Sequence, residues 1–234
     1  MRHTIIILAL LFFGCSKQQE QMSNYVSTNT LEQVTVEKSK LILAETNNCD
    51  QTKLSNQFDI SIDFKRYVDT IEIEQSCFLK VYIKDKLSKS MIDSFSITSP
   101  FYYSFMFLSC DSMTSYSTKF KSSRKGMDNY YGDIVVADLN FDGYDDIAVV
   151  NDGGGNAGPL YSYYLQNNNK KFTKDIFLTD TMEFFPSEIN SKEYSLTTYV
   201  HSGACSIREH IYKLDKKGNI WTQISNTLIN ICEE

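Results

Sequence analysis

The sequence predicts an all-β fold, either an antiparallel β-sandwich or a small irregular propeller-like domain. Residues that suit a half-buried, pleated strand (Ile, Val, Thr, Tyr and Phe) make up about a third of the 234 residues, whereas Ala, the best helix former, is scarce. Apolar and polar residues alternate along several short runs, and turn residues separate these runs. Helical bundles and Rossmann-type domains are therefore poor candidates.

Short strand-like runs recur along a β-rich region that we expect to span residues 31–234. The segment from Phe58 to Phe64 alternates strictly, and a hairpin turn is expected at Asp215–Gly218, with Gly218 at positive φ. A long loop with a strand fragment is expected at 109–129. No internal repeat is evident, which argues against a propeller with one equivalent loop in every blade. The other predicted strands are 70–75, 78–84, 91–97, 101–108, 132–140, 146–150, 161–165, 195–200, 207–214 and 219–224.

Residues 1–14 have the features of a bacterial lipoprotein signal peptide. The apolar run from Ile5 to Phe13 follows Arg2 and is too short to span a bilayer. Gly14 precedes Cys15 as in a lipobox, although Phe12 stands where Leu is usual. We expect Cys15 to be acylated and to anchor the chain in the bacterial cell envelope, facing the periplasm or the cell surface. An ordinary cleaved signal peptide is the alternative. The polar residues 15–30 predict a tether that carries this lipidated cysteine.

Charge and cysteine content exclude several classes of site. The net charge of −6 and the pI near 5.2 argue against a nucleic-acid partner. The chain has no C-x-x-C pair and few histidines, which argues against a zinc or thioredoxin-like centre. Because we expect the chain to be exported from the reducing cytoplasm, its cysteines can form lasting disulfides. Because the number of cysteines after Cys15 is odd, at least one is unpaired within the chain; these are Cys49, Cys77, Cys110, Cys205 and Cys232.

One motif predicts a metal-binding site. It is D-x-N-x-D-G-x-x-D, at residues 138–146. Its alternate positions bring the side-chain oxygens of Asp138, Asn140 and Asp142 to one centre. The carbonyl of Tyr144 and the carboxylate of Asp146 complete a set of hard oxygen ligands that suits Ca²⁺ better than Mg²⁺ or a soft metal. We therefore predict a calcium loop, and we call residues 121–234 the calcium-loop part of the domain and 31–120 its N-terminal part.

This loop differs from an EF-hand. Position 12 is Val149 rather than a bidentate Glu, and the flanking sequences are strands instead of helices. The acidic residues of the loop would repel one another without a cation, which favours ion binding over the alternative of an acidic surface turn without an ion. Asp145, at position 8, is expected to point away from the ion and to contribute only solubility.

A glycine-rich segment follows the second of these strands. It satisfies G-x-G-x-x-G at residues 153–158, but Pro159 and a strand-like run come next, so it does not open the helix that a nucleotide site requires. We interpret Gly153, Gly154, Gly155 and Asn156 as a candidate contact loop for a partner, with a plain turn between strands as the alternative. Motifs of nucleophilic or zinc hydrolases are absent, which argues against an enzyme.

The run YYGDIVVADLNFDGYDDIAVVNDGGGNAGPLYSYYL resembles FG-GAP-like and VCBS-like exported bacterial proteins, and in particular single-loop lipoproteins, over about residues 130–232. The resemblance implies the five calcium ligands named above. Some lipoproteins of this kind are immunity proteins that inhibit peptidoglycan hydrolases. It also suggests a Cys205–Cys232 disulfide, which is geometrically reasonable because the intervening hairpin returns the chain toward its start; two buried free thiols are the alternative.

Two functions follow from these observations. The first is a non-enzymatic, calcium-stabilised lipoprotein that binds a protein partner, with inhibition of a peptidoglycan hydrolase as the expected activity. The second is a cell-surface adhesion or glycan-binding module with a structural calcium site. Inhibition of a muramidase in a stoichiometric assay would distinguish the first function from the second.

Overall fold

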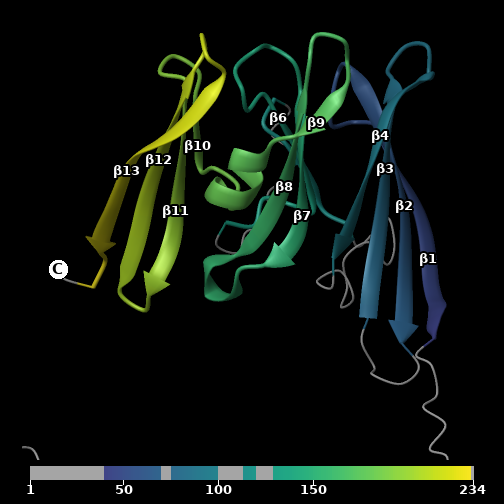
Figure 1. Cartoon of the computed structure of the whole chain (residues 1–234), viewed down its shortest axis with the longest axis horizontal. Coiled ribbons are helices and arrows are strands. Elements are labelled where there is room, and N and C mark those ends of the chain that lie inside the picture. The colour runs from purple at the N-terminus through teal and green to yellow at the C-terminus, as the bar shows by residue number, and fades with distance from the viewer. Residues whose placement is uncertain (1–39, 70–74, 100–112, 120–128, 233–234) are drawn as a thin grey trace, which may run out of the picture. The chain divides into compact units, whose positions relative to one another are not determined.

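The computed structural model describes residues 40–69, 75–99, 113–119 and 129–232 (Figure 1). All of these belong to one compact unit, Ser39–Glu234. The predicted signal peptide, Cys15, the tether, Cys110 and the predicted strand 101–108 lie outside the described residues, as does most of the predicted strand 70–75. The described part of the chain contains no helix long and apolar enough to cross a membrane.

The first sheet is an antiparallel meander in the order β1-β2-β3-β4, built from β1 (Leu41–Gln51), β2 (Phe58–Asp69), β3 (Gln75–Asp85) and β4 (Met91–Ser99). The alternation of the sequence sets its two faces, since successive side chains of a strand point to opposite sides. Ile60 and Ile62 of β2 lie opposite Ile83 and Val81 of β3, and all four are buried. The intervening residues of these strands form the outer face.

The middle sheet carries the predicted calcium loop. Its order is β5-β6-β7-β8-β9, and only β5 and β6 are parallel. Its strands are β5 (Ser115–Ser117), β6 (Ile134–Ala137), β7 (Asp146–Gly153), β8 (Pro159–Gln166) and β9 (Phe172–Lys174). The sequence IVVA of β6 is buried throughout, and so are the first five residues of β7. This explains their continuous apolar character, because both of their faces are covered.

The third sheet is a second antiparallel meander, β10 (Glu188–Asn190), β11 (Ser195–Gly203), β12 (Ser206–Asp215) and β13 (Ile220–Asn230). The hairpin predicted near Asp215–Gly218 is present between β12 and β13. The prediction for its turn was wrong in one detail. Asn219, at φ 52°, and not Gly218, takes the left-handed conformation, which asparagine tolerates well because its short side chain bonds locally.

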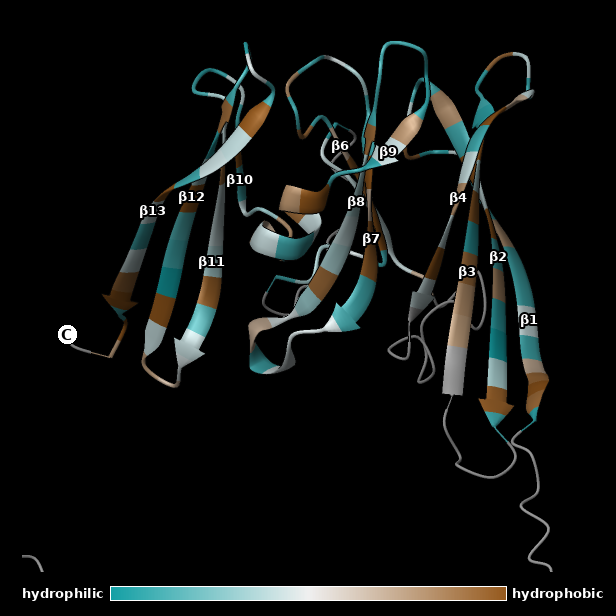
Figure 2. Ribbon diagram, in the orientation of Figure 1, coloured by the Kyte–Doolittle hydropathy of each residue, from teal (hydrophilic) through white to brown (hydrophobic). Residues whose placement is uncertain are grey.

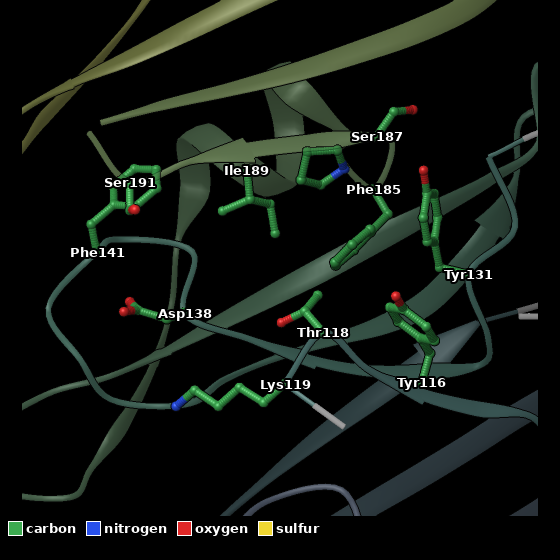
Figure 3. A pocket seen from close by; sticks show the side chains of 11 residues that line it. Tyr116, Thr118, Lys119, Tyr131, Asp138, Phe141, Phe185, Ser187, Ile189 and Ser191 are labelled. Atoms are coloured by element: carbon green, nitrogen blue, oxygen red, sulfur yellow. The ribbon is translucent and has the colours of Figure 1, made fainter. Parts of the chain in front are cut away.

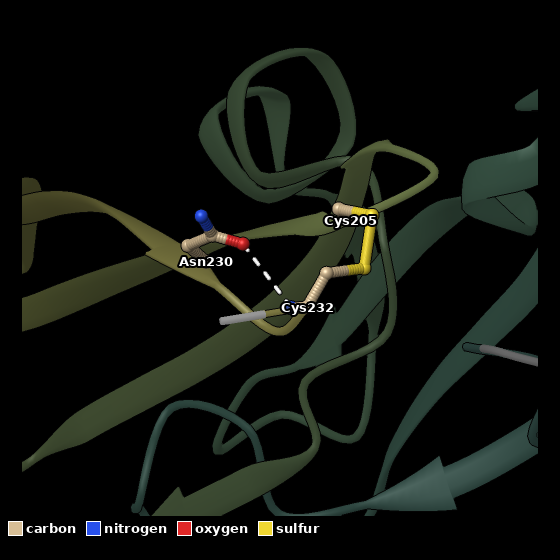
Figure 4. Close-up of a disulfide and its surroundings, with 3 residues drawn as sticks. All are labelled: Cys205, Asn230 and Cys232. Carbon is tan, nitrogen blue, oxygen red and sulfur yellow. Dashed lines mark hydrogen bonds between the residues drawn. A yellow bond between two sulfur atoms is a disulfide. The ribbon is translucent and has the colours of Figure 1, made fainter. Parts of the chain in front are cut away.

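A disulfide joins Cys205 to Cys232, with their Cα atoms 5.1 Å apart, and confirms the predicted pairing (Figure 4). Cys205 lies in the turn between β11 and β12, and Cys232 follows β13. The amide of Cys232 also donates to the side chain of Asn230, 3.1 Å away. The bond therefore ties the end of the edge strand to the turn that precedes β12.

Aromatic contacts join the three sheets into one core. Phe95 of β4 stacks on Tyr164 of β8, with ring centroids 3.6 Å apart. On the other side of the middle sheet, Phe177 lies 5.9 Å from Tyr212 of β12 and 6.5 Å from Trp221 of β13. Phe177 precedes a short π-helical turn, η3 (Leu178–Met182). None of the three sheets closes on itself, and the predicted all-β fold with packed sheets is confirmed.

Candidate metal centre and contact loop

The predicted calcium loop connects β6 to β7, as expected from its apolar flanks. Asp138 follows β6 directly, and Asp146 is the first residue of β7. Gly143 adopts φ 89°, and a Cβ atom there would meet nothing within 4 Å, so glycine is required by the backbone conformation and not by crowding. Phe141 also has positive φ, 61°. These two residues turn the chain sharply enough for Asp138, Asn140 and Asp142 to approach one another.

Side-chain oxygens of the loop bind its own backbone amides. The two carboxylate oxygens of Asp138 accept bonds from the amides of Asp142 and Gly143, each at 3.0 Å. The Asn140 side chain accepts from the Asp142 amide at 3.1 Å and donates to the Asp142 carboxylate at 3.0 Å. The amide of Tyr144 donates to Asp142 at 2.9 Å. The structure thus brings together the side chains of Asp138, Asn140 and Asp142, three of the predicted ligands.

Asp146 is fully buried and holds the two ends of the loop. One of its oxygens accepts from the amide of Leu139 at 2.8 Å, and the other accepts from the amide of Gln166 on β8 at 2.8 Å. Burial raises its pKa well above the ordinary value, and the charges of Asp142 and Asp138 raise it further. Burial, followed by the charge of Asp142, also raises the pKa of Asp138.

The donors of this loop fit a hard cation. They are carboxylate, amide and carbonyl oxygens, the ligand types that Ca²⁺ takes in flexible loops. No group of three or more His, Cys, Asp or Glu side chains with metal-binding spacing occurs in the described ranges. The proposed ligand set instead depends on the Asn140 side chain and the carbonyl of Tyr144 in addition to the carboxylates. A bound cation would offset the mutual repulsion of Asp138, Asp142 and Asp146.

Asp145 does not point into solvent, and the expectation that it contributes only solubility was wrong. Its side chain is 1% exposed. One carboxylate oxygen pairs with the Lys119 ammonium, and the other accepts a hydrogen bond from the buried Ser55 hydroxyl at 2.7 Å. Nothing in the local sequence identifies these partners, because they lie 26 and 90 residues away along the chain.

The third sheet also contacts the loop. The Lys216 ammonium, in the β12–β13 turn, donates to the carbonyls of Phe141 at 3.0 Å and Asn140 at 3.3 Å. The ring of Phe141 lies 5.7 Å from Tyr194 and 6.2 Å from Trp221. The loop is thus held on one side by Ser55, which precedes β2, and on the other by the third sheet.

A cavity of about 340 Å³ lies beside the loop (Figure 3). Asp138 and Lys119 line it at one end, and the rings of Tyr116, Tyr131 and Phe185 line it at the other. Tyr131 and Phe185 pack together with ring centroids 4.9 Å apart. The cavity thus combines apolar walls with one carboxylate and one ammonium, a lining that suits an amphipathic group of modest size.

The candidate contact loop connects β7 to β8 at the opposite end of β7 from the metal loop. It contains a 3₁₀ turn, η2 (Gly155–Ala157), and is closed by backbone bonds: the Gly154 amide donates to the Gly158 carbonyl at 2.8 Å, and the Gly158 amide to the Gly155 carbonyl at 3.2 Å. The side chain of Asn129 donates to the carbonyl of Ala157 at 2.6 Å. Gly153 and Asn156 remain exposed. The loop is a preformed turn with an exposed tip.

The remaining cysteines differ in state. Cys77 of β3 is the free cysteine among the described residues and is fully buried. Burial raises the pKa of its thiol to about 11. Cys49 of β1 is disulfide-bonded. The odd cysteine count of the sequence correctly predicted that a thiol would remain, but it did not identify which one.

Comparisons with known proteins show little similarity of sequence. No protein-family model matches the chain, and no curated protein matches it. A solved structure, that of a Xanthomonas type IV secretion system related protein, is similar at 17% identity with a TM-score of 0.49, and the alignment covers 82% of this chain and 83% of that one.

Proposed function

We propose that this chain is a non-enzymatic bacterial envelope lipoprotein, anchored through acylated Cys15 and stabilised by Ca²⁺, which binds a protein partner through its contact loop. The proposed partner is a peptidoglycan hydrolase, which the chain inhibits. The proposed calcium ligands are Asp138, Asn140, Asp142, the carbonyl of Tyr144 and Asp146.

The observation that carries this proposal is the construction of the contact loop. Its backbone is closed by hydrogen bonds, while Gly155 and Asn156 at the tip are exposed. A Cβ atom on Gly154 would lie 2.4 Å from the Gly158 carbonyl oxygen and 2.9 Å from the Phe184 ring, so the turn has no spare room. A loop that is already ordered loses little entropy when it binds, which favours recognition by insertion into a partner's cleft.

The proposed calcium site supports the same role through β7. This strand begins at Asp146, which holds the metal loop, and ends at Gly153, where the contact loop starts. A cation that orders residues 138–146 therefore orders the strand that presents the contact loop. The buried carboxylates of Asp145 and Asp146 are bonded to the fold itself, which supports structural roles for them.

Titration of a lysozyme-type muramidase with the chain tests this proposal. We expect clearing of a peptidoglycan suspension to stop near one equivalent of protein. Asn156→Arg, at the exposed tip, should abolish inhibition, whereas Asn168→Arg, in the exposed β8–β9 turn, should leave it unchanged. Unaltered clearing at several equivalents, with binding to glycans or cells instead, would favour an adhesion module.

The anchor has its own test. Radiolabelled palmitate should enter the wild-type chain and not a Cys15→Ser variant, and the variant should be recovered in the soluble fraction. Equal labelling of both proteins would exclude acylation of Cys15.

A further inference from the structure

We infer that one end of the first sheet lies against the lipid headgroup surface when the chain is anchored; this inference rests on the proposed acylation of Cys15. The contact surface, which we call the outer-face patch, consists of Leu41, Leu43, Lys65, Tyr67 and Phe78. It combines aliphatic, aromatic and lysine side chains, the mixture that is typical of the membrane–water interface.

Strand register places these side chains on one face. Leu43 of β1 lies opposite Tyr67 of β2, and Lys65 of β2 lies opposite Phe78 of β3. Paired residues of an antiparallel sheet point to the same side, and residues two apart share that side, which adds Leu41. Leu41 is 58% exposed and Leu43 is 48% exposed. Leu41, Lys65, Tyr67 and Phe78, together with Thr98, line a hollow of about 390 Å³.

The middle of the outer face is polar, and it separates the patch from Met91, which is 55% exposed at the other end of the sheet. Beyond it, Asp63 lies opposite Lys80, and Ser61 lies opposite Tyr82. The first residues of β1 are coloured as hydrophobic in Figure 2, in contrast to the polar middle of the same strand. On the opposite face, Ile60 and Leu79 are buried in the core, whereas Ile42, at the same end as the patch, is 48% exposed. The outer-face patch itself lies on the side of the sheet that faces away from the core.

The position of the patch identifies the bilayer as the partner. Leu41 is where the chain enters the sheet from the proposed anchor, and the strand order puts the end of β2 and the start of β3 at that same end. Twenty-four residues lie between Cys15 and Lys40. A polar tether such as the one expected at residues 15–30 spans roughly 22 Å on average, so the patch stays within reach of the surface to which the acyl chains are fixed. Anchoring and surface contact then reinforce each other, as two weak membrane signals do.

Fluorescence quenching by brominated lipids tests the contact. The lipidated full chain is reconstituted into vesicles of phosphatidylethanolamine and phosphatidylglycerol, with or without bromine on the acyl chains near the headgroups. Trp221, the single tryptophan, is 8% exposed and gives a constant background. Leu41→Trp reports on the patch, and Leu43→Trp is a second reporter. Ile224→Trp is the matched control, since Ile224 on β13 is 57% exposed and lies in the third sheet.

We expect brominated vesicles to reduce the emission of the Leu41→Trp chain below that of the wild type, and to leave the Ile224→Trp chain at the wild-type level. Equal quenching of both variants, or none at position 41 in a chain that floats with the vesicles, overturns the inference. Protection of the Leu41→Trp indole from acrylamide without quenching by lipid would show that protein covers the patch, and overturns it too. A chain that does not float contradicts the anchor itself and removes the basis of the inference.

Discussion

The hydroxyl of Ser55, between β1 and β2, donates a hydrogen bond to the carboxylate of Asp145, 90 residues later in the chain, at 2.7 Å. Both side chains are almost fully buried. Ser55 also accepts a bond from the amide of Gln57 at 2.9 Å. One serine therefore links the connection that leads into β2 to the loop that carries the proposed ligands.

Replacing this serine should destabilise the whole unit. Ser55→Ala leaves one oxygen of Asp145 without its donor in a buried setting, and such a loss costs about 1–3 kcal/mol of the free energy of unfolding. Chemical denaturation should show a lower midpoint with an unchanged slope. Ser202→Ala, at an exposed position of β11, is the control and should be neutral. A midpoint equal to that of the wild type would show that the Ser55–Asp145 bond does not contribute to stability.

Calcium should raise the melting temperature of the wild-type chain. At a free concentration a hundred times the dissociation constant, mass action gives about 2.7 kcal/mol, and extracellular calcium modules bind at roughly 10⁻⁴–10⁻³ M, so millimolar calcium is the appropriate range. Asp142→Ala should abolish the calcium-dependent rise. Asp180→Ala, an exposed carboxylate of η3, should retain it. Identical melting curves of the wild type with calcium and with chelator would exclude the ion.

Two neighbouring glycines of the contact loop should respond differently to substitution. Gly154→Ala forces a Cβ atom to 2.4 Å from the Gly158 carbonyl oxygen, so the loop backbone must move. Gly155→Ala meets no atom within 4 Å and only places alanine at φ 61°, which costs about 1 kcal/mol. We expect hydrogen exchange at the Gly158 amide to accelerate strongly in the first variant and slightly in the second. Equal exchange in both would mean that the turn is not closed as described.

The sequence patterns predicted the local features of this fold and missed the long-range ones. Alternation predicted the strand that starts at Phe58, and the D-x-N-x-D-G-x-x-D spacing predicted a turn between two buried strands, because both depend on neighbouring residues. The bonds from Ser55 and Lys119 to Asp145 depend on how distant segments pack, and a carboxylate beside a loop looks the same in sequence whether it is buried or exposed. The parallel pairing of β5 with β6 depends on tertiary contacts in the same way.

The Cys205–Cys232 bond should stabilise the chain measurably. A sequence separation of 27 residues gives about 3.5 kcal/mol in the chain-entropy treatment. Replacing both cysteines with alanine should therefore lower the free energy of unfolding by up to about that amount. Peptide mapping without reduction should recover a fragment that links the two residues. Recovery of both as alkylated peptides without prior reduction would contradict the bond.

Cys77 should behave as a protected thiol whose titration affects stability at high pH. Its pKa is about 11 in the folded chain because burial disfavours the thiolate, compared with 9.0 for a solvent-exposed cysteine thiol. Between these two pH values the folded state holds the proton that the unfolded state has lost. The contribution of the buried thiol to the free energy of unfolding is therefore complete below pH 9.0 and declines as the pH rises toward about 11.

Cys77→Ala should reduce that decline in stability at high pH, although the cavity that the substitution leaves lowers stability at every pH. Denaturation midpoints of both proteins from pH 8 to 11 measure the difference, and iodoacetamide should label Cys77 only after unfolding. Rapid labelling of the native chain, or parallel pH profiles, would show that the thiol is not buried as the structure has it.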